Sequence, residues 1–357
     1  MRSPPDTNGH SQPKKLDPRA LPPTQFMRTA QSYGLSEDLC RRWAGAVIGN
    51  GLREPVEIMD ASHIPRARRE IVSEAPSLAL SRHDRSPTDG FEKLLFKTGE
   101  GFSVETVLIP LEKEGRVSLC LSSQVGCVMG CTFCATARMT TRRNLTSWEI
   151  LDQFVQPRAI VKAQGRRVTG AVFMGMGEPF LNFNNVITAA EWMRFPIKDA
   201  ISGKAITIST VGLVGEIEKF TDMDLPFRLS ISLGAATDEK RSLLVPVAAR
   251  TPVARVMEAA RRHALARRDR INLAYVCVGG VNVSEEDARA LGELVGDTPV
   301  RLDLIDVNDT AGRFHPPSSE ELKSFRDALA RHVKHPIARR YSGGKDIRAS
   351  CGALAGT

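Results

Sequence analysis

The 357-residue sequence predicts an α/β protein whose main part is a partial barrel of six β/α units, preceded by a small helical domain. Two observations predict this fold. From about residue 92, short apolar runs of strand length alternate with segments of helical periodicity, as in parallel sheets joined by crossover helices. Six such units are fewer than the eight of a complete barrel, so the sheet should curve without closing.

The chain divides into four parts by composition. Residues 1–23 are rich in proline and lack apolar periodicity, which predicts a disordered tail. Residues 24–91 predict a helical accessory domain, because apolar residues from Phe26 to Val47 recur at helical spacing. Residues 92–340 form the predicted core, and residues 341–357 form a C-terminal tail.

The predicted core begins with two strands, at 93–97 and 104–111. A third apolar run, 117–123, leads directly into a cysteine-rich loop. Thr146 begins a Thr-Ser-Trp-Glu capping pattern, which predicts a helix over 146–163. The further predicted strands are 170–174, 205–209, 227–232, 271–277 and 300–307, and the further predicted helices are 184–195, 213–222, 252–267, 284–296 and 318–333.

The cysteine-rich loop carries Cys127, Cys131 and Cys134 at C-x3-C-x2-C spacing. Thiolates are the usual ligands of iron–sulfur clusters, and a cubane cluster held by three of them leaves one iron open. An open iron can chelate the amino and carboxylate groups of S-adenosylmethionine (SAM). Structural zinc is the alternative, but it needs four ligands, and no His or fourth Cys stands nearby at finger spacing. The loop follows a strand, so the cluster should lie at the carboxyl edge of the sheet.

A second motif, Met174-Gly175-Met176-Gly177-Glu178-Pro179, follows the next strand. Its glycines would allow the backbone to approach a ligand, and Glu178 could accept hydrogen bonds from an ammonium group. A turn with no ligand is the other interpretation. The position one β/α unit after the cysteine loop favours contact with SAM.

Four further cysteines lie outside this loop. Cys351 is flanked by small residues in the C-terminal tail. If this tail is mobile, it could carry the Cys351 thiol into the site, although a lone tail cysteine is more often inert. Cys120 lies on the strand before the loop, whereas Cys40 and Cys277 have the apolar surroundings of small core residues.

The net charge of +8 favours a polyanionic partner such as RNA, although a generically basic protein has the same charge. The helical domain could then dock RNA, or act as a lid or spacer. The arginine-rich segment 255–270 could face RNA or solvent. Cysteine ligands of a cluster require a reducing compartment, and no apolar stretch approaches membrane length, so the sequence predicts a cytoplasmic protein without a membrane partner.

Together these motifs resemble the radical-SAM adenosine RNA methyltransferases. The resemblance extends over residues 25–356 and includes the run 120–127, the cysteine loop, Arg143-Asn144-Leu145, the Met-Gly-Met-Gly-Glu-Pro motif and the tail Cys-Gly-Ala-Leu-Ala-Gly. That family methylates C2 of an adenosine in 23S rRNA and in tRNA, and a related branch methylates C8. The resemblance implies a partial (β/α)6 radical-SAM barrel, a [4Fe–4S] cluster, SAM, an electron donor such as flavodoxin or ferredoxin, and a monomer.

The resemblance also implies roles for individual residues. Cys127, Cys131 and Cys134 would ligate the cluster. The residues that would bind SAM are Gly177, Glu178, Ser209, Ser232, Leu233, Gly234 and Asn308. Cys351 would accept a methyl group from a first SAM. A second SAM would be cleaved reductively to a radical that activates this methyl group for addition to the base. Cys120 would then form a disulfide with Cys351 and release the product, and Glu105 would accept a proton.

Three departures from the family pattern fall around the SAM and substrate sides of the site. Gly234 stands where His is usual, Asp306-Val307 where Pro-Trp is usual, and Val283 where Asp is usual. They leave the cluster motif intact and affect the identity of the RNA. Two alternatives from other classes are a radical-SAM enzyme with a peptide or small-molecule substrate and an RNA-binding protein without catalysis. Cys120, Cys351 and the basic helical module disfavour the first alternative, and the presence of every expected cysteine disfavours the second.

Overall fold

The computed structural model describes residues 15–356, which fold as two compact units. One unit comprises residues up to Ser77 together with Phe195–Ala200, and the other comprises Leu78–Arg194 and the chain from Ile201 onward. Most of the predicted disordered tail, residues 1–14, lies outside the described residues. Residues 15–23 are ordered, because Leu16 is buried and Arg19, fully buried, pairs with Asp17 and donates to the Pro76 carbonyl.

The smaller unit is helical, as the sequence predicts. Its helices are η1 (Pro18–Ala20), α1 (Pro23–Ser32), α2 (Glu37–Ala44), η2 (Gly45–Gly49), α3 (Pro55–Ser62) and η3 (Arg66–Ile71). Ser36 caps α2 by accepting a hydrogen bond from the Leu39 amide. The core of the unit contains Phe26 and Trp43, whose rings pack edge to face with centroids 5.2 Å apart.

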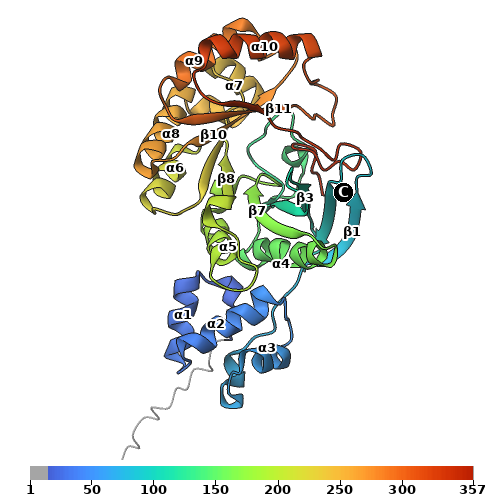
Figure 1. The fold of residues 1–357 in the computed structure, drawn as a ribbon, viewed down its shortest axis with the longest axis vertical. Coiled ribbons are helices and arrows are strands. Elements are labelled where there is room, and N and C mark those ends of the chain that lie inside the picture. The colour runs from blue at the N-terminus through green and yellow to red at the C-terminus, as the bar shows by residue number, and fades with distance from the viewer. Residues whose placement is uncertain (1–14, 357) are drawn as a thin grey trace, which may run out of the picture. The chain divides into compact units, whose positions relative to one another are not determined.

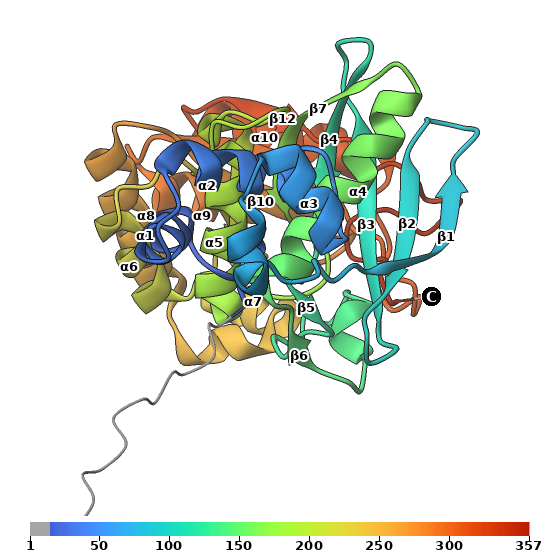
Figure 2. The ribbon, with the colours of Figure 1, turned by 90° about the horizontal axis from the view of Figure 1, so that it is seen from below.

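The larger unit contains one ten-stranded sheet with the order β1-β2-β3-β4-β7-β8-β9-β10-β11-β12 (Figures 1 and 2). Strands β1 to β4 pair antiparallel, and the strands from β4 to β12 pair parallel. The strands are β1 (Ala79–Arg85), β2 (Glu92–Lys97), β3 (Ser103–Pro110), β4 (Arg116–Cys120), β7 (Arg167–Phe173), β8 (Ile206–Thr210), β9 (Arg228–Ser232), β10 (Ile271–Cys277), β11 (Val300–Asp306) and β12 (Ile337–Arg339). The six predicted β/α units of an open sheet are confirmed.

Residues 78–91, which the sequence pattern groups with the helical domain, join the larger unit instead. The reason is β1, which pairs with β2 from Ala79 opposite Lys97 to Arg85 opposite Glu92. The short β5 (Gln124–Val125) and β6 (Arg143–Asn144) form a separate two-stranded ribbon on either side of the cysteine loop.

Crossover helices connect the parallel strands and flank the sheet (Figure 1). They are α4 (Ser147–Ala163), α5 (Phe183–Arg194), α6 (Val214–Asp222), α7 (Asp238–Leu244), α8 (Val253–Arg267), α9 (Glu285–Val295) and α10 (Ser319–His332). Capping boxes at Thr146, Ser284 and Ser318 begin α4, α9 and α10. Among the described residues, no helix combines the length and the apolar character needed to cross a bilayer.

Candidate active site

The carboxyl ends of the parallel strands surround a cavity of about 130 Å³, which we call the central cavity. Its walls come from the cysteine loop, from the ends of β7 to β11 and from the C-terminal tail. The sequence-predicted residues that line it are Cys131, Cys134, Gly177, Glu178, Ser209, Ser232 and Cys351.

The cysteine loop runs from β5 to the short helix η4 (Thr136–Arg138). Its three cysteines are half-buried, and their thiols are free. Burial raises the pKa of Cys127 to about 12 and that of Cys131 well above its usual value, and the neighbouring thiols of the loop raise both further. In the part of the chain that the structure describes, no three His, Cys, Asp or Glu side chains converge closely enough to hold a metal ion.

The donor set of this loop nevertheless fits an iron–sulfur cluster. Three free thiols on one eight-residue run are soft ligands, and Cys131 and Cys134 line the central cavity.

The glycines of the second motif line the central cavity, and they also allow the loop after β7 to pack closely on residues 121–124. A Cβ atom on Gly175 would lie 2.7 Å from the Leu121 carbonyl oxygen, and one on Gly177 would lie 2.6 Å from Cβ of Gln124. Gly177 also has a φ of +101°, which favours glycine. The loop after β7 therefore packs directly on the segment that leads into the cysteine loop.

Glu178 is buried at the wall of the central cavity. Its carboxylate accepts hydrogen bonds from the amides of Phe180 and Val211, at 3.0 and 2.9 Å. Burial raises its pKa to about 7, although these hydrogen bonds favour the ionised form. A cationic ligand in the cavity would therefore stabilise the charge of this carboxylate.

The other predicted SAM residues divide into two groups. Ser209 and Ser232 face each other across β8 and β9, with their hydroxyl oxygens 3.2 Å apart, and both line the cavity. The backbone carbonyls of Leu233 and Gly234 accept hydrogen bonds from Arg241 and Asn282, so this segment braces the loops behind the cavity. Asn308 instead donates to the Cys351 carbonyl at 3.3 Å and to the Ser342 hydroxyl at 3.1 Å.

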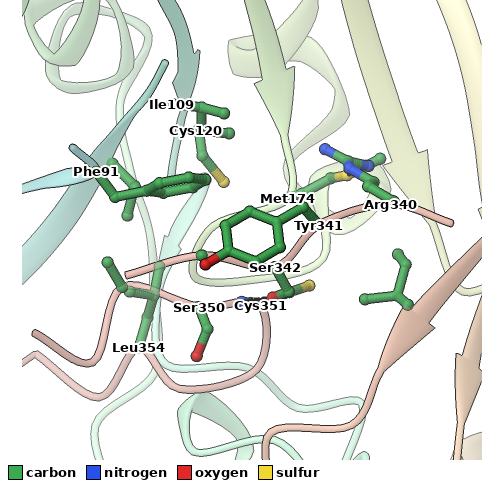
Figure 3. Close-up of a pocket in the computed structure, with 14 residues that line it drawn as sticks. Phe91, Ile109, Cys120, Met174, Arg340, Tyr341, Ser342, Ser350, Cys351 and Leu354 are labelled. Atoms are coloured by element: carbon green, nitrogen blue, oxygen red, sulfur yellow. Dashed lines mark hydrogen bonds between the residues drawn. The ribbon is translucent and has the colours of Figure 1, made fainter. Parts of the chain in front are cut away.

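A second, smaller cavity of about 60 Å³, the tail cavity, is lined by both Cys120 and Cys351 (Figure 3). Cys120 comes from β4 and Cys351 from the C-terminal tail, with Arg340 and Met174 beside them (Figure 3). Cys351 is exposed as a residue, yet its thiol is desolvated between the two cavities, which raises its pKa. Burial raises the pKa of Cys120 to about 12, and the Arg340 guanidinium acts in the opposite direction on both thiols.

The expected disulfide between these two cysteines is not formed in this structure, because all seven cysteines of the chain have free thiols. Both thiols line the tail cavity, and Met174, Ile305, Leu354 and Cys351 line both cavities. Cys351 is therefore the predicted reactive thiol that borders the central and the tail cavities.

Glu105 does not line either cavity. It is fully buried on β3, where one carboxylate oxygen lies 2.9 Å from Nζ of Lys93. The other oxygen accepts hydrogen bonds from the amides of Ala355 and Gly356, at 2.9 and 3.1 Å. The predicted proton acceptor thus holds the tail in this arrangement.

Sequence reasoning missed three charged residues at the site. Arg241 is buried, and its guanidinium donates to the carbonyls of Val211, Leu233 and Thr251. Arg340 lies beside the two thiols, and Lys93 pairs with Glu105. A lysine inside an apolar strand run was the available signal for Lys93, since an unpaired ammonium is rarely buried. Nothing in the local sequence distinguishes Arg241 or Arg340 from surface arginines.

Comparisons with known proteins identify the superfamily of this chain. Residues 121–295 match the Radical SAM superfamily. The crystal structure of a radical SAM methyltransferase from Sphaerobacter thermophilus superposes with a TM-score of 0.86 and 31% identity, covering 97% of this chain and 100% of that one. The fold and the three-thiol loop therefore define a radical SAM protein.

Relatives identify the family more closely. The chain is 43% identical to "Probable RNA methyltransferase Anae109_4379" of Anaeromyxobacter sp. (strain Fw109-5), over 91% of this chain and 95% of that protein. It is 37% identical to "Dual-specificity RNA methyltransferase RlmN" of the same strain, over 95% of this chain and 90% of the relative. The chain belongs to the family of radical SAM RNA methyltransferases.

Proposed function

We propose that this protein methylates C2 of an adenosine in 23S rRNA, in tRNA or in both, and that Cys351 carries the methyl group. The observation that carries this proposal is the position of Cys351, which borders both the central cavity and the tail cavity. A carrier thiol has to receive a methyl group at one site and deliver it at another. C2 of adenine is not nucleophilic, so direct transfer from SAM to this carbon is chemically unfavourable.

The residues around the carrier suit these two tasks. A thiolate is the nucleophilic form of cysteine, and Arg340 favours this form of Cys351 against the effect of burial. Cys120 lies in the same cavity, where its thiolate can attack the Cys351 sulfur once the methyl carbon is bonded to the base. That attack forms an S–S bond and breaks the bond from sulfur to carbon, whose electron pair remains with the RNA. The carbon takes up a proton, which completes the methyl group of the released RNA. A reductant then restores both thiols.

The cysteine loop and the walls of the central cavity contain the residues that we expect to bind the cofactors. Cys127, Cys131 and Cys134 would hold a [4Fe–4S] cluster, and Gly177, Glu178, Ser209 and Ser232 would contact SAM. When bound, the cluster supplies the electron for radical chemistry on SAM. We expect the electron donor to be a small redox protein such as flavodoxin or ferredoxin, and the enzyme to act as a cytoplasmic monomer.

The relatives support RNA as the substrate class. In Myxococcus xanthus (strain DK1622), the protein named probable RNA methyltransferase is 41% identical to this chain, and two proteins named RlmN are 37% and 40% identical to it. The departure at Gly234 is two residues after the cavity-lining Ser232, and the departure at Asp306 directly follows the cavity-lining Ile305. The names of these relatives do not distinguish between ribosomal RNA and tRNA, so the two RNAs are supplied in separate reactions.

The test is an anaerobic reaction of the reconstituted protein with methyl-labelled SAM, a reductant and either 23S rRNA or tRNA. We expect label in 2-methyladenosine after digestion of the RNA to nucleosides and mass spectrometry. Label in 8-methyladenosine would replace the C2 assignment by C8. Cleavage of SAM without label in either RNA would contradict the proposal and favour a non-RNA substrate.

A further inference from the structure

The tail that carries Cys351 is held on two sides. On one side, the Ala135 amide donates to the Gly352 carbonyl at 2.8 Å, and the Thr136 hydroxyl donates to the Leu354 carbonyl at 2.7 Å. On the other side, the amides of Ala355 and Gly356 donate to one oxygen of Glu105. The Glu105 contacts are the only ones among these four with a side-chain acceptor, so they depend on the orientation and charge of one carboxylate.

Lys93 determines both the orientation and the charge of the Glu105 carboxylate. Strands β2 and β3 pair antiparallel with Lys93 opposite Val107 and Leu95 opposite Glu105, which places the two charged residues diagonally across the ladder. The Lys93 side chain is 2% exposed and that of Glu105 is fully buried. The ammonium lies 2.9 Å from Oε1, an oxygen that has this ion pair but accepts no hydrogen bond from residues 15–356. Oε2 is thereby left to the tail amides.

A buried carboxylate needs compensation at both oxygens, since an unpaired charge in an apolar site is strongly unfavourable. Lys93 compensates one oxygen of Glu105, and the docked tail compensates the other. Hydrogen bonds from amides to an ionised acceptor are stronger than those to a neutral one. Undocking of the tail would leave Oε2 without its two donors, so the charge of Glu105 favours the docked tail.

We propose that Lys93 and Glu105 form a latch that docks the Cys351-bearing tail, and that Lys93 is a positioning residue in it. The latch itself does not depend on the proposed function, but its consequence for catalysis does. While Oε2 accepts the two tail amides, it is not available to a proton from the substrate. Tail docking and proton acceptance by Glu105 therefore alternate, and the tail must leave the latch before Glu105 acts as a base.

Hydrogen exchange of the tail amides tests the latch without any methyl transfer. In the full-length, cluster-loaded protein, Glu105→Gln should accelerate exchange in the peptide that covers residues 352–357 by about tenfold or more, because the variant lacks the charge-assisted acceptor. Lys93→Met should accelerate it as well, and Lys93→Arg, which keeps the cation, should restore most of the protection. Unchanged exchange in Glu105→Gln, or equal exchange in Lys93→Met and Lys93→Arg, would overturn the proposal.

Glu92→Gln is the matched control. Glu92 is a fully buried carboxylate on the same strand as Lys93, and it pairs with Arg166 and His83 rather than with the tail. This variant should lower thermal stability as Glu105→Gln does, yet leave exchange of residues 352–357 as in the wild type. Faster tail exchange in Glu92→Gln would show that general destabilisation, and not the latch, controls the tail.

Ala355→Pro covers the case in which the Glu105 and Lys93 variants do not fold. Proline removes the amide donor at 355 and leaves the buried ion pair intact. We expect faster exchange at Ala353 and Gly356 and faster alkylation of Cys351 by iodoacetamide, and wild-type rates for both would overturn the latch. A wild-type protein that shows this latch but methylates no RNA would contradict the proposed function alone.

Discussion

The amide of Ala135 donates a 2.8 Å hydrogen bond to the carbonyl oxygen of Gly352. These residues directly follow Cys134 and Cys351, so the proposed cluster ligand and the proposed methyl carrier are adjacent to the two ends of one main-chain hydrogen bond. A main-chain bond does not depend on side-chain identity. The relative position of the two cysteine-bearing segments is therefore determined by the backbone of the loop and the tail.

Substitution of the loop cysteines tests the cluster assignment. Protein purified without oxygen should contain about four iron atoms per chain, and Cys127→Ala, Cys131→Ala and Cys134→Ala should each lose most of this iron and the associated visible absorbance. Cys277→Ala is the control, because Cys277 is buried on β10 outside the loop. Full iron content in any of the three loop variants would remove that cysteine from the ligand set.

Variants that lack either cysteine of the tail cavity should stop at different steps of methyl transfer. Cys351→Ala has no thiol to receive a methyl group, so it should retain its iron and form no covalent complex with RNA. Cys120→Ala can accept the methyl group and bond it to the base, but it lacks the thiol that attacks sulfur. It should accumulate a protein–RNA complex that migrates slowly on a denaturing gel and disappears with ribonuclease.

Normal turnover by Cys120→Ala would contradict its role in product release. A covalent complex in the Cys120→Ala/Cys351→Ala double variant would show that another residue bonds to the RNA. Either outcome would leave the radical SAM fold and the cluster motif unaffected, and would change only the carrier mechanism.

Hydrophobic periodicity was sufficient for the first six of the seven parallel strands and their long helices, because buried strands and amphipathic helices have distinct apolar patterns. It missed β1, whose sequence Ala-Leu-Ser-Arg-His-Asp-Arg is largely exposed, and the short elements α7 and β12, which have seven and three residues. In the site, the cysteine spacing identified the loop. The pairing of Lys93 with Glu105 could not be predicted, because it depends on the register between β2 and β3.

His263 should make stability sensitive to acid. It is buried on α8, stacked on Phe220, and burial lowers its pKa from 6.5 to about 4. The Thr221 hydroxyl donates to the Ile217 carbonyl, so it accepts from Nδ1–H of the neutral ring. The unfolded chain binds more protons than the folded one between pH 6.5 and 4, so stability falls as the pH decreases through this window, by about 3 kcal/mol.

His263→Asn keeps a donor near Thr221 but cannot titrate in this range. Urea unfolding of both proteins between pH 7.5 and 4 should show a smaller loss of unfolding free energy in the variant, even if the variant is less stable at pH 7.5. Parallel pH profiles would contradict the assignment of this acid sensitivity to His263.

The arginine-rich segment 255–270 has fewer available charges than its sequence suggests. Arg255 pairs with Glu258, Arg262 with Asp222, and Arg267 with Asp224. Arg261, Arg268 and Arg270 make no ion pair within the described residues. If this segment faces RNA, replacing these three arginines by Gln should weaken RNA binding. The slope of the logarithm of the binding constant against the logarithm of the salt concentration should then become less steep by about one unit for each phosphate that the variant no longer neutralises.

Arg262→Gln is the control for that experiment, because its charge is already compensated on the protein. Binding affinities measured between low and moderate salt give the slope directly. An unchanged slope in the triple variant, with unchanged iron content, would mean that this face of α8 is simply solvated.

The close approach of Gly175 and Gly177 to residues 121–124 has a consequence for how the site could diversify. One added methyl group at either glycine would separate the loop after β7 from the segment that enters the cysteine loop. The spacing between the proposed SAM-binding and iron-binding parts is thus fixed by backbone thickness rather than by replaceable side chains. We expect changes in substrate preference at the other walls instead, which the ends of β9 and β11 and the tail form.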